Sequence, residues 1–103
     1  MKESDIEREV CKYAEGCGFL VRKYNSAGVV GVPDRIFFGF GLVFLIEFKT
    51  PTGRLSAMQE REIQRIRDHG VKCFVVDDVD DGKRIIDGAI RTARMHPGCE
   101  RCK

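Results

Sequence analysis

The sequence predicts an α/β domain in which helices flank a mixed β-sheet. Two observations indicate this fold class: a run of β-forming residues broken by a glycine-rich turn, and helical patterns that precede and follow it. With 103 residues the chain is long enough for one domain and too short for two. We assign residues 1–96 to this domain and expect residues 97–103 to form a flexible tail.

The first helix and the first strand follow from local patterns. Apolar residues recur at helical spacing through residues 4–17. Ser4 or Asp5 can cap the start of this helix, and Gly18 follows its end. The β-forming run at residues 19–24 then predicts a strand.

A β-hairpin is expected next, after a glycine-containing loop at residues 25–32. Residues 34–38 and 42–49 are rich in β-branched and aromatic side chains and predict two strands. The three residues 39–41, Gly-Phe-Gly, fit a tight turn between them.

The second half of the chain predicts a helix, a strand and a last helix. Ser56 opens a helical pattern that continues to about Asp68, and residues 71–78 are strong β formers. The segment DDGKR (80–84) is expected to be a turn, and residues 84–95 a third helix. The predicted order is therefore α-β-β-β-α-β-α.

The composition excludes several classes of protein. No apolar run reaches the roughly 18 residues of a membrane span, and the charged start does not resemble a signal peptide. We therefore expect a cytoplasmic protein, in a bacterium or in the host cell if a phage encodes it. The net charge of +2 argues neither for nor against nucleic acid, and five irregularly spaced cysteines do not resemble a secreted disulfide framework.

Asp34, Glu47 and Lys49 are charged residues inside the apolar hairpin. Glu47 and Lys49 share a face of their strand, and antiparallel pairing brings Asp34 close to Glu47. A buried ion pair with Lys49 would explain one acid and leave the other unexplained. A divalent cation relieves the repulsion between two carboxylates, and oxygen ligands favour Mg²⁺ or Mn²⁺. We favour the metal site over the salt bridge.

These residues are ordered as Pro33-Asp34, twelve intervening residues, and Glu47-Phe48-Lys49, an order that resembles the PD-(D/E)xK nuclease motif. The stretches GVPDRIFF, FLIEFKTPTGRLSAMQ and GVKCFVVDD are similar to the VRR-NUC family of DNA-cleaving domains, over about residues 3–78. The resemblance implies an αβββαβ core with a mixed sheet. It also implies a Mg²⁺- or Mn²⁺-dependent endonuclease that hydrolyses phosphodiester bonds in DNA.

The resemblance also implies roles for the residues of the motif. Asp34, Glu47 and the backbone carbonyl of Phe48 would be metal ligands. Lys49 would lie beside the attacking water, orient it and favour its ionised form. It would also add positive charge where negative charge develops in the transition state.

Two further positions leave alternatives open. Gln59 matches a glutamine that the family carries on this helix, yet it also fits a capping box with Ser56. We favour the site role for Gln59, and both roles are compatible. Glu3 or Glu7, one turn apart on the first helix, is expected to add an acid to the site.

DNA and a second copy of the chain are the expected partners. Residues that could contact phosphates are Arg22, Lys23, Asn25, Ser26 and Arg54, with Arg61 and Arg65 as further candidates. Stand-alone VRR-NUC domains resemble Holliday-junction resolvases that act as homodimers, so we expect a homodimer acting on four-way junctions. The apolar hairpin around Phe37, Phe38 and Phe40, or the third helix, is expected to supply the contact.

Other activities remain possible on the sequence alone. The chain fits a nuclease for flaps or forks, a restriction-like enzyme, or a non-catalytic DNA-binding module. Cys99 and Cys102 form a CxxC with His96 nearby, which would fit a small redox module or half of a zinc site completed across a dimer. We favour the interpretation that this segment is a flexible tail without a binding site.

Overall fold

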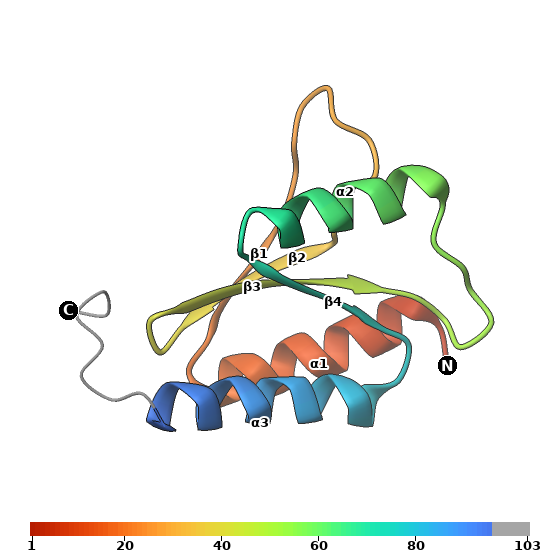
Figure 1. Ribbon diagram of the computed structural model, residues 1–103. Coiled ribbons are helices and arrows are strands. Elements are labelled where there is room, and N and C mark those ends of the chain that lie inside the picture. The colour runs from red at the N-terminus through yellow and green to blue at the C-terminus, as the bar shows by residue number, and fades with distance from the viewer. Residues whose placement is uncertain (96–103) are drawn as a thin grey trace.

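The computed structural model describes residues 1–95 and has the predicted order of elements. Three helices surround one four-stranded sheet with strand order β1-β2-β3-β4 (Figure 1). The strand pairs are antiparallel except for β3 and β4, which are parallel. The elements are α1 (Glu3–Cys17), β1 (Leu20–Lys23), β2 (Arg35–Gly39), β3 (Leu42–Phe48), α2 (Ala57–Asp68), β4 (Lys72–Val76) and α3 (Val79–Met95). The predicted α/β fold class with a mixed sheet is therefore confirmed.

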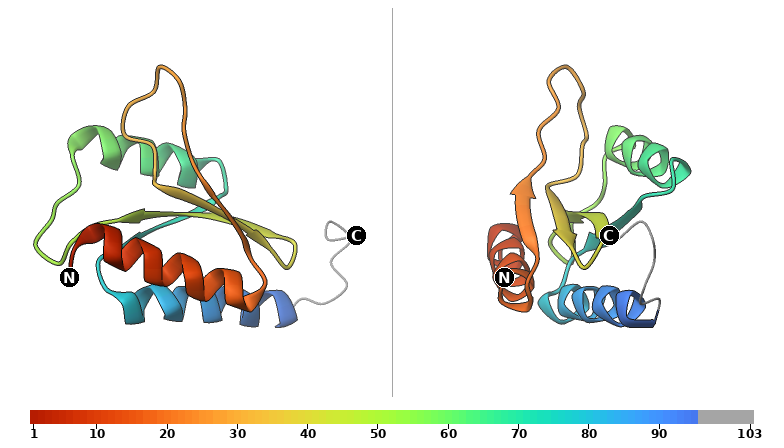
Figure 2. Two further views of the ribbon diagram at one scale, coloured as in Figure 1. Left: turned by 180° about the vertical axis from the view of Figure 1, so that it is seen from behind. Right: turned by 90° about the vertical axis from the view of Figure 1, so that its left-hand side faces the viewer.

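The helices cover the sheet unequally. Helices α1 and α3 lie side by side on one face, and α2 alone lies on the other (Figures 1 and 2). The main core fills the space under α1 and α3, where Phe44, Ile46 and Phe48 of β3 are buried. Leu45 points the opposite way and packs in a smaller cluster under α2. Strand β3 is thus buried on both faces, and the alternation expected from sequence is confirmed.

Helix α1 begins earlier than the sequence analysis expected. Glu3 is its first residue, and Lys2 rather than Ser4 or Asp5 occupies the cap position. Asp5 instead lies in the first turn, and its carboxylate accepts a bond from the backbone N–H of Lys2 at 3.4 Å. The cap prediction was wrong because an acid in the first turn can serve the exposed N–H groups as well as a cap residue can.

The hairpin turn is tighter than expected. Gly39 pairs with Leu42, so two residues rather than three make the turn. The two turn residues, Phe40 and Gly41, have positive φ values of 56° and 75°, as a type I′ turn requires. The prediction missed this because a phenylalanine rarely adopts positive φ. Contact with Phe19 at 5.1 Å between ring centroids holds the Phe40 side chain here.

Helix α3 starts at Val79, so the turn predicted at residues 80–84 is wrong. The Asp78 carboxylate accepts a bond from the N–H of Asp81 at 3.1 Å and caps the helix. Gly82, the residue that indicated a turn, is buried against α1, where an added Cβ would lie 2.4 Å from Val10. Glycine is present here for close helix packing rather than for a turn.

Other expectations concern single side chains. Cys11 and Cys73 are buried in the core, and Cys17 is half-buried. Phe37 is fully buried, whereas Phe38 and Phe40 are exposed. Phe37 therefore cannot take part in a contact between copies, and a contact through the rest of the hairpin remains a prediction. The CxxC of the tail and His96 lie outside the described residues. Among residues 1–95, no helix is long and apolar enough to cross a membrane.

Candidate active site

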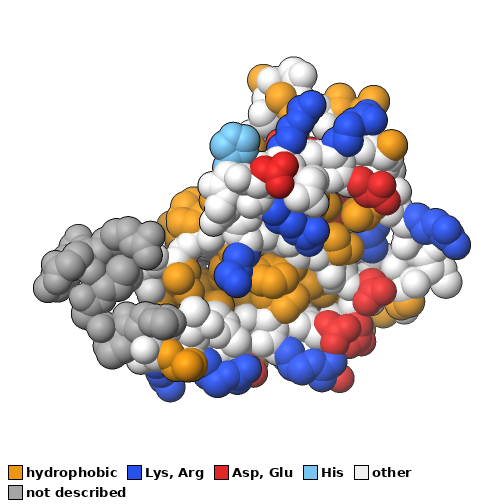
Figure 3. Space-filling model, in the orientation of Figure 1, with side chains coloured by type: hydrophobic (Ala, Val, Ile, Leu, Met, Phe, Trp, Pro, Cys, Tyr) orange, Lys and Arg blue, Asp and Glu red, His pale blue; other side chains and the backbone are white. Residues whose placement is uncertain are grey.

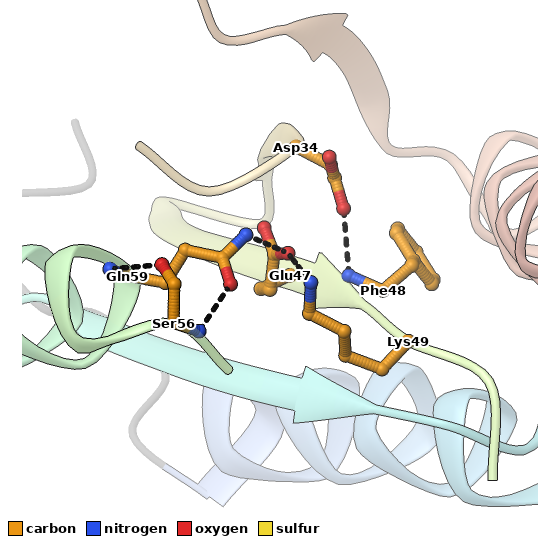
Figure 4. A network of polar contacts seen from close by, with 6 residues as sticks. All are labelled: Asp34, Glu47, Phe48, Lys49, Ser56 and Gln59. Atoms are coloured by element: carbon orange, nitrogen blue, oxygen red, sulfur yellow. Dashed lines mark hydrogen bonds and ion pairs between the residues drawn. The ribbon is translucent and has the colours of Figure 1, made fainter. Parts of the chain in front are cut away.

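Strands β2 and β3 bring Asp34 and Glu47 together. Arg35 pairs with Ile46, and one further step along the same register sets Asp34 opposite Glu47. The two-residue turn is what gives this register. The Asp34 carboxylate accepts a bond of 2.7 Å from the backbone N–H of Phe48 (Figure 4). Asp34 is thereby fixed across the end of β3.

Glu47 is the buried centre of the cluster, with only 2% of its surface exposed. Its Oε2 accepts from Lys49 Nζ at 3.2 Å and from Gln59 Nε2 at 3.0 Å (Figure 4). Within residues 1–95, its other oxygen, Oε1, is buried without any hydrogen-bond partner. Buried polar atoms are nearly always paired, so this oxygen indicates a missing ligand.

The two carboxylates perturb each other. Burial raises the pKa of Glu47 from 4.5 to about 7, and the Asp34 charge adds to this rise while Lys49 opposes it. Burial also raises the pKa of Asp34, against the opposing effect of the Phe48 N–H. Strong shifts of this kind accompany sites where function requires charges to be close.

Helix α1 adds a third acid. Carboxylate oxygens of Glu3, Asp34 and Glu47 all lie within 4.8 Å of one another. Glu7, one turn later, instead forms an ion pair with Arg35 at 2.6 Å. The structure therefore brings Glu3, and not Glu7, into the cluster.

Gln59 makes the contacts expected for both of its predicted roles, as a helix cap and as a residue of the acidic cluster. Its carbonyl oxygen accepts from the Ser56 N–H at 2.9 Å, and its own N–H donates to the Ser56 hydroxyl at 3.1 Å, which completes a capping box. The Nε2 of the same side chain donates to Glu47. The start of α2 and the buried carboxylate are thus joined through one side chain.

The cluster fits a hard divalent cation. Three carboxylates face one ammonium, which leaves two negative charges when all are ionised. All the candidate ligand atoms are oxygens, which Mg²⁺ and Mn²⁺ prefer. The unpartnered Glu47 Oε1 is an acceptor that such an ion would satisfy.

The predicted phosphate contacts lie mostly on the surface, outside this cluster. Arg22, Lys23, Asn25 and Arg54 are exposed, and Ser26 is half-buried. The Arg22 guanidinium donates to the carbonyl of Val21 at 2.8 Å. The assignment of these residues to DNA remains a prediction.

Sequence reasoning missed Arg35. Its ion pair with Glu7 connects α1 to β2 one residue after Asp34, and so fixes the helix that carries Glu3. The available signal was its place inside an otherwise apolar strand, the same signal that singled out the acids.

Comparisons with known proteins agree with this geometry. The family model described as the VRR-NUC domain matches residues 10–79. A solved structure described as a VRR_NUC domain is 28% identical with a TM-score of 0.77, and the match covers 84% of this chain and 96% of that one.

A second structure, described as a VRR_NUC domain protein, is 15% identical with a TM-score of 0.74 and covers 88% of this chain and 89% of that one, which shows a shared fold. No curated protein matches the sequence significantly. The matched segment includes Asp34, Glu47, Lys49 and Gln59, and extends from within α1 to the start of α3. The chain therefore has a nuclease-type fold and belongs to the VRR-NUC domain family.

Proposed function

We propose that this protein is a metal-dependent endonuclease that hydrolyses phosphodiester bonds in DNA. The observation that carries the proposal is the convergence of three carboxylates beside a lysine, with a buried oxygen of Glu47 left without a partner among residues 1–95. A salt bridge alone does not explain this arrangement, because Lys49 contacts one oxygen of one acid. Membership of a nuclease family supports the same activity.

Glu3, Asp34 and Glu47 would hold Mg²⁺ or Mn²⁺. The Phe48 carbonyl is a fourth candidate ligand, because N–H and C=O of one strand residue point to the same side and its N–H donates to Asp34. When bound, the cation lowers the pKa of a water and offsets charge on the phosphate. Gln59 keeps the Glu47 carboxylate oriented by donating to Oε2.

Lys49 would orient the attacking water and stabilise the negative charge that develops in the transition state. Its side chain is about five-sixths buried, and its Nζ stands 3.2 Å from Glu47, so its position is fixed. A fixed ammonium near the reacting phosphate lowers the energy of a negatively charged transition state without reorganisation during the step. Lys49 would also orient the attacking water through its N–H donors.

The preferred substrate in this proposal is a four-way junction, cut by a homodimer. One chain holds one set of site residues, so paired cuts require two chains. The exposed basic and polar side chains before β2, including Arg22, Lys23 and Asn25, would contact the backbone near the cut. Salt-dependent binding is expected from such contacts.

The test is cleavage of a labelled panel of linear duplex, flap, fork and four-way junction, each with Mg²⁺, Mn²⁺ or EDTA. Cleavage should need the metal and should be fastest on the junction. Lys49→Ala should lower the rate by about 10²–10³-fold while DNA binding is kept. Lys72→Ala, which removes an exposed lysine of β4, is the matched control. Metal-independent cleavage, or a Lys49→Ala rate equal to wild type, would refute the proposal.

A further inference from the structure

The loop between β1 and β2 stands away from the rest of the molecule (Figure 2). Its ends are joined by a bond of 3.1 Å from the Tyr24 N–H to the Asp34 carbonyl. A second bond, from the Val29 N–H to the Ser26 carbonyl at 3.2 Å, closes a turn at the tip. The tip nevertheless carries apolar side chains, with Val29 41% exposed and Val30 71% exposed. Two adjacent exposed valines on a projecting loop form a small apolar patch that a partner could cover.

The loop is fixed to the helix that carries Gln59. Gly31 has a φ of +90°, and an added Cβ would lie 2.8 Å from the carbonyl carbon of Met58 and 2.9 Å from the backbone nitrogen of Gln59. The backbone of the loop therefore packs directly on the first turn of α2. Since Gln59 also bonds Glu47, the tip has a fixed position relative to the acidic cluster.

Basic groups accompany this apolar tip. Val29 lines a largely apolar groove of about 580 Å³ together with Arg65 of α2, which also forms an ion pair with Glu62 at 3.8 Å. Exposed Arg22 and Lys23 lead into the loop from β1. Figure 3 shows hydrophobic and basic side chains next to each other over this end of the molecule. Apolar side chains among cations are typical of proteins that insert a wedge between bases while contacting phosphates.

We propose that Val30, supported by Val29, is a wedge that inserts between bases at the branch point of bound DNA. The wedge would open the base step next to the phosphate that is hydrolysed at the acidic cluster. This inference rests on the proposed function and adds how the substrate is recognised, namely by how easily its bases unstack. Branch points suit such a wedge because bases there are easier to unstack than bases within a continuous duplex. DNA is favoured over a second copy as the occupant because the loop is anchored beside the site and flanked by basic residues.

The direct test uses a four-way junction with 2-aminopurine at the branch and Ca²⁺ in place of Mg²⁺ to suppress cleavage. Wild-type protein should raise the fluorescence several-fold as the base unstacks. Val30→Ser should lose most of this rise, and Val30→Phe should keep it. Met95→Ser, at an apolar residue 75% exposed at the end of α3, should behave as wild type.

Cleavage gives a second, independent reading. Val30→Ser should cut a fully paired junction at least about tenfold more slowly, because the base step would have to unstack without an inserted side chain. It should cut a branch that already carries unpaired bases at the wild-type rate. An equal fluorescence rise for Val30→Ser and wild type would overturn the wedge. So would a change from dimer to monomer in Val30→Ser, which would assign the tip to a contact between copies.

The two proposals can fail separately. If no DNA is cut by any variant, the proposed endonuclease is wrong, and a fluorescence rise that depends on Val30 still supports the wedge. If wild type cuts junctions and Val30→Ser does so equally fast, the wedge is wrong and the endonuclease stands.

Discussion

At the scale of single residues, Glu47 is a buried carboxylate whose charge is incompletely compensated. It is buried, its Oε2 is shared by an ammonium and an amide, and its Oε1 has no partner within residues 1–95. Burying a carboxylate without full compensation raises the free energy of the charged form. The raised pKa of Glu47 is the expression of that cost.

The pH dependence of stability should report this cost in the metal-free protein. Because the folded-state pKa is raised from 4.5 to about 7, the folded protein holds this proton more tightly than the unfolded chain does. The resulting stabilisation is complete below about pH 4.5 and is lost as the pH rises through about 7. The loss amounts to roughly 3 kcal/mol, at about 1.4 kcal/mol per pKa unit.

Chemical denaturation in EDTA across pH 4–8 measures this effect, with Glu47→Gln as the reference that cannot ionise. The free energy of unfolding of wild type should fall relative to that of the variant as the pH rises. A difference that stays constant across the range would mean that folding leaves the pKa of Glu47 unchanged.

Glu3 and Glu7 differ by one helical turn and should differ in metal binding. Glu3 belongs to the acidic cluster, whereas Glu7 is paired with Arg35. Glu3→Gln should weaken Mn²⁺ binding at least about tenfold, since even changes to groups behind the ligands cost that much. Glu7→Gln should mainly lower stability. Isothermal titration with Mn²⁺ separates the two, and a larger loss of affinity in Glu7→Gln would reverse the assignment.

At the scale of elements, the packing of α1 on α3 positions the acid at the start of α1. Arg35 fixes one point of α1 through Glu7. Gly82 of α3 fixes another, because its missing side chain lets Val10 approach closely. The place of Glu3 in the cluster therefore depends on two contacts remote from the acids themselves.

Substitutions at two glycines of α3 should have opposite effects. Gly82→Ala would place a Cβ 2.4 Å from Val10 Cγ2, and such overpacking typically costs about 1–3 kcal/mol. Gly88→Ala meets nothing nearer than 3.7 Å, so the better helix propensity of alanine should stabilise by up to about 1 kcal/mol. Thermal or urea unfolding of both variants gives the comparison. Equal effects would show that α1 and α3 are packed less closely than described.

The sequence predicted most of this arrangement, and its failures have physical causes. Asp34, Glu47 and Lys49 were visible because charge inside an apolar strand needs a reason. The sequence could not decide between Glu3 and Glu7, because which turn of α1 faces the cluster depends on how the helix packs on the rest of the protein. The start of α3 was missed because a buried glycine and a turn glycine look alike without the neighbour, Val10, that requires it.

At the scale of the whole molecule, the sheet face that carries α2 is covered over only part of its width. Helix α2 packs against β4 and leaves apolar side chains of the other strands exposed. Leu20 pairs with Phe38, and Phe38 with Val43, so the three form one row across β1, β2 and β3. Their exposed fractions are 49%, 37% and 48%. We expect this row to be an interaction surface.

A homodimer through this row is the last prediction. A two-fold contact would set each row against its copy, and a stable interface buries roughly 800 Å² per partner. Sedimentation and light scattering should give a dimer for wild type. Phe38→Asp and Val43→Lys should give monomers, because each sets a charge against its own copy in a dry contact. Met95→Lys, at an exposed apolar residue of α3, should remain dimeric.

Cleavage of a single substrate, a cruciform plasmid, reports both the oligomeric state and the nuclease activity. On a cruciform plasmid, a dimer with two sites in fixed relation should make paired cuts that linearise the DNA within one encounter. The monomeric variants keep all the site residues, so they should still nick, and nicked circles should accumulate before linear DNA appears. A wild-type protein that stays monomeric at micromolar concentration, or monomeric variants that linearise the plasmid as directly as wild type, would show that this face of the sheet has another partner.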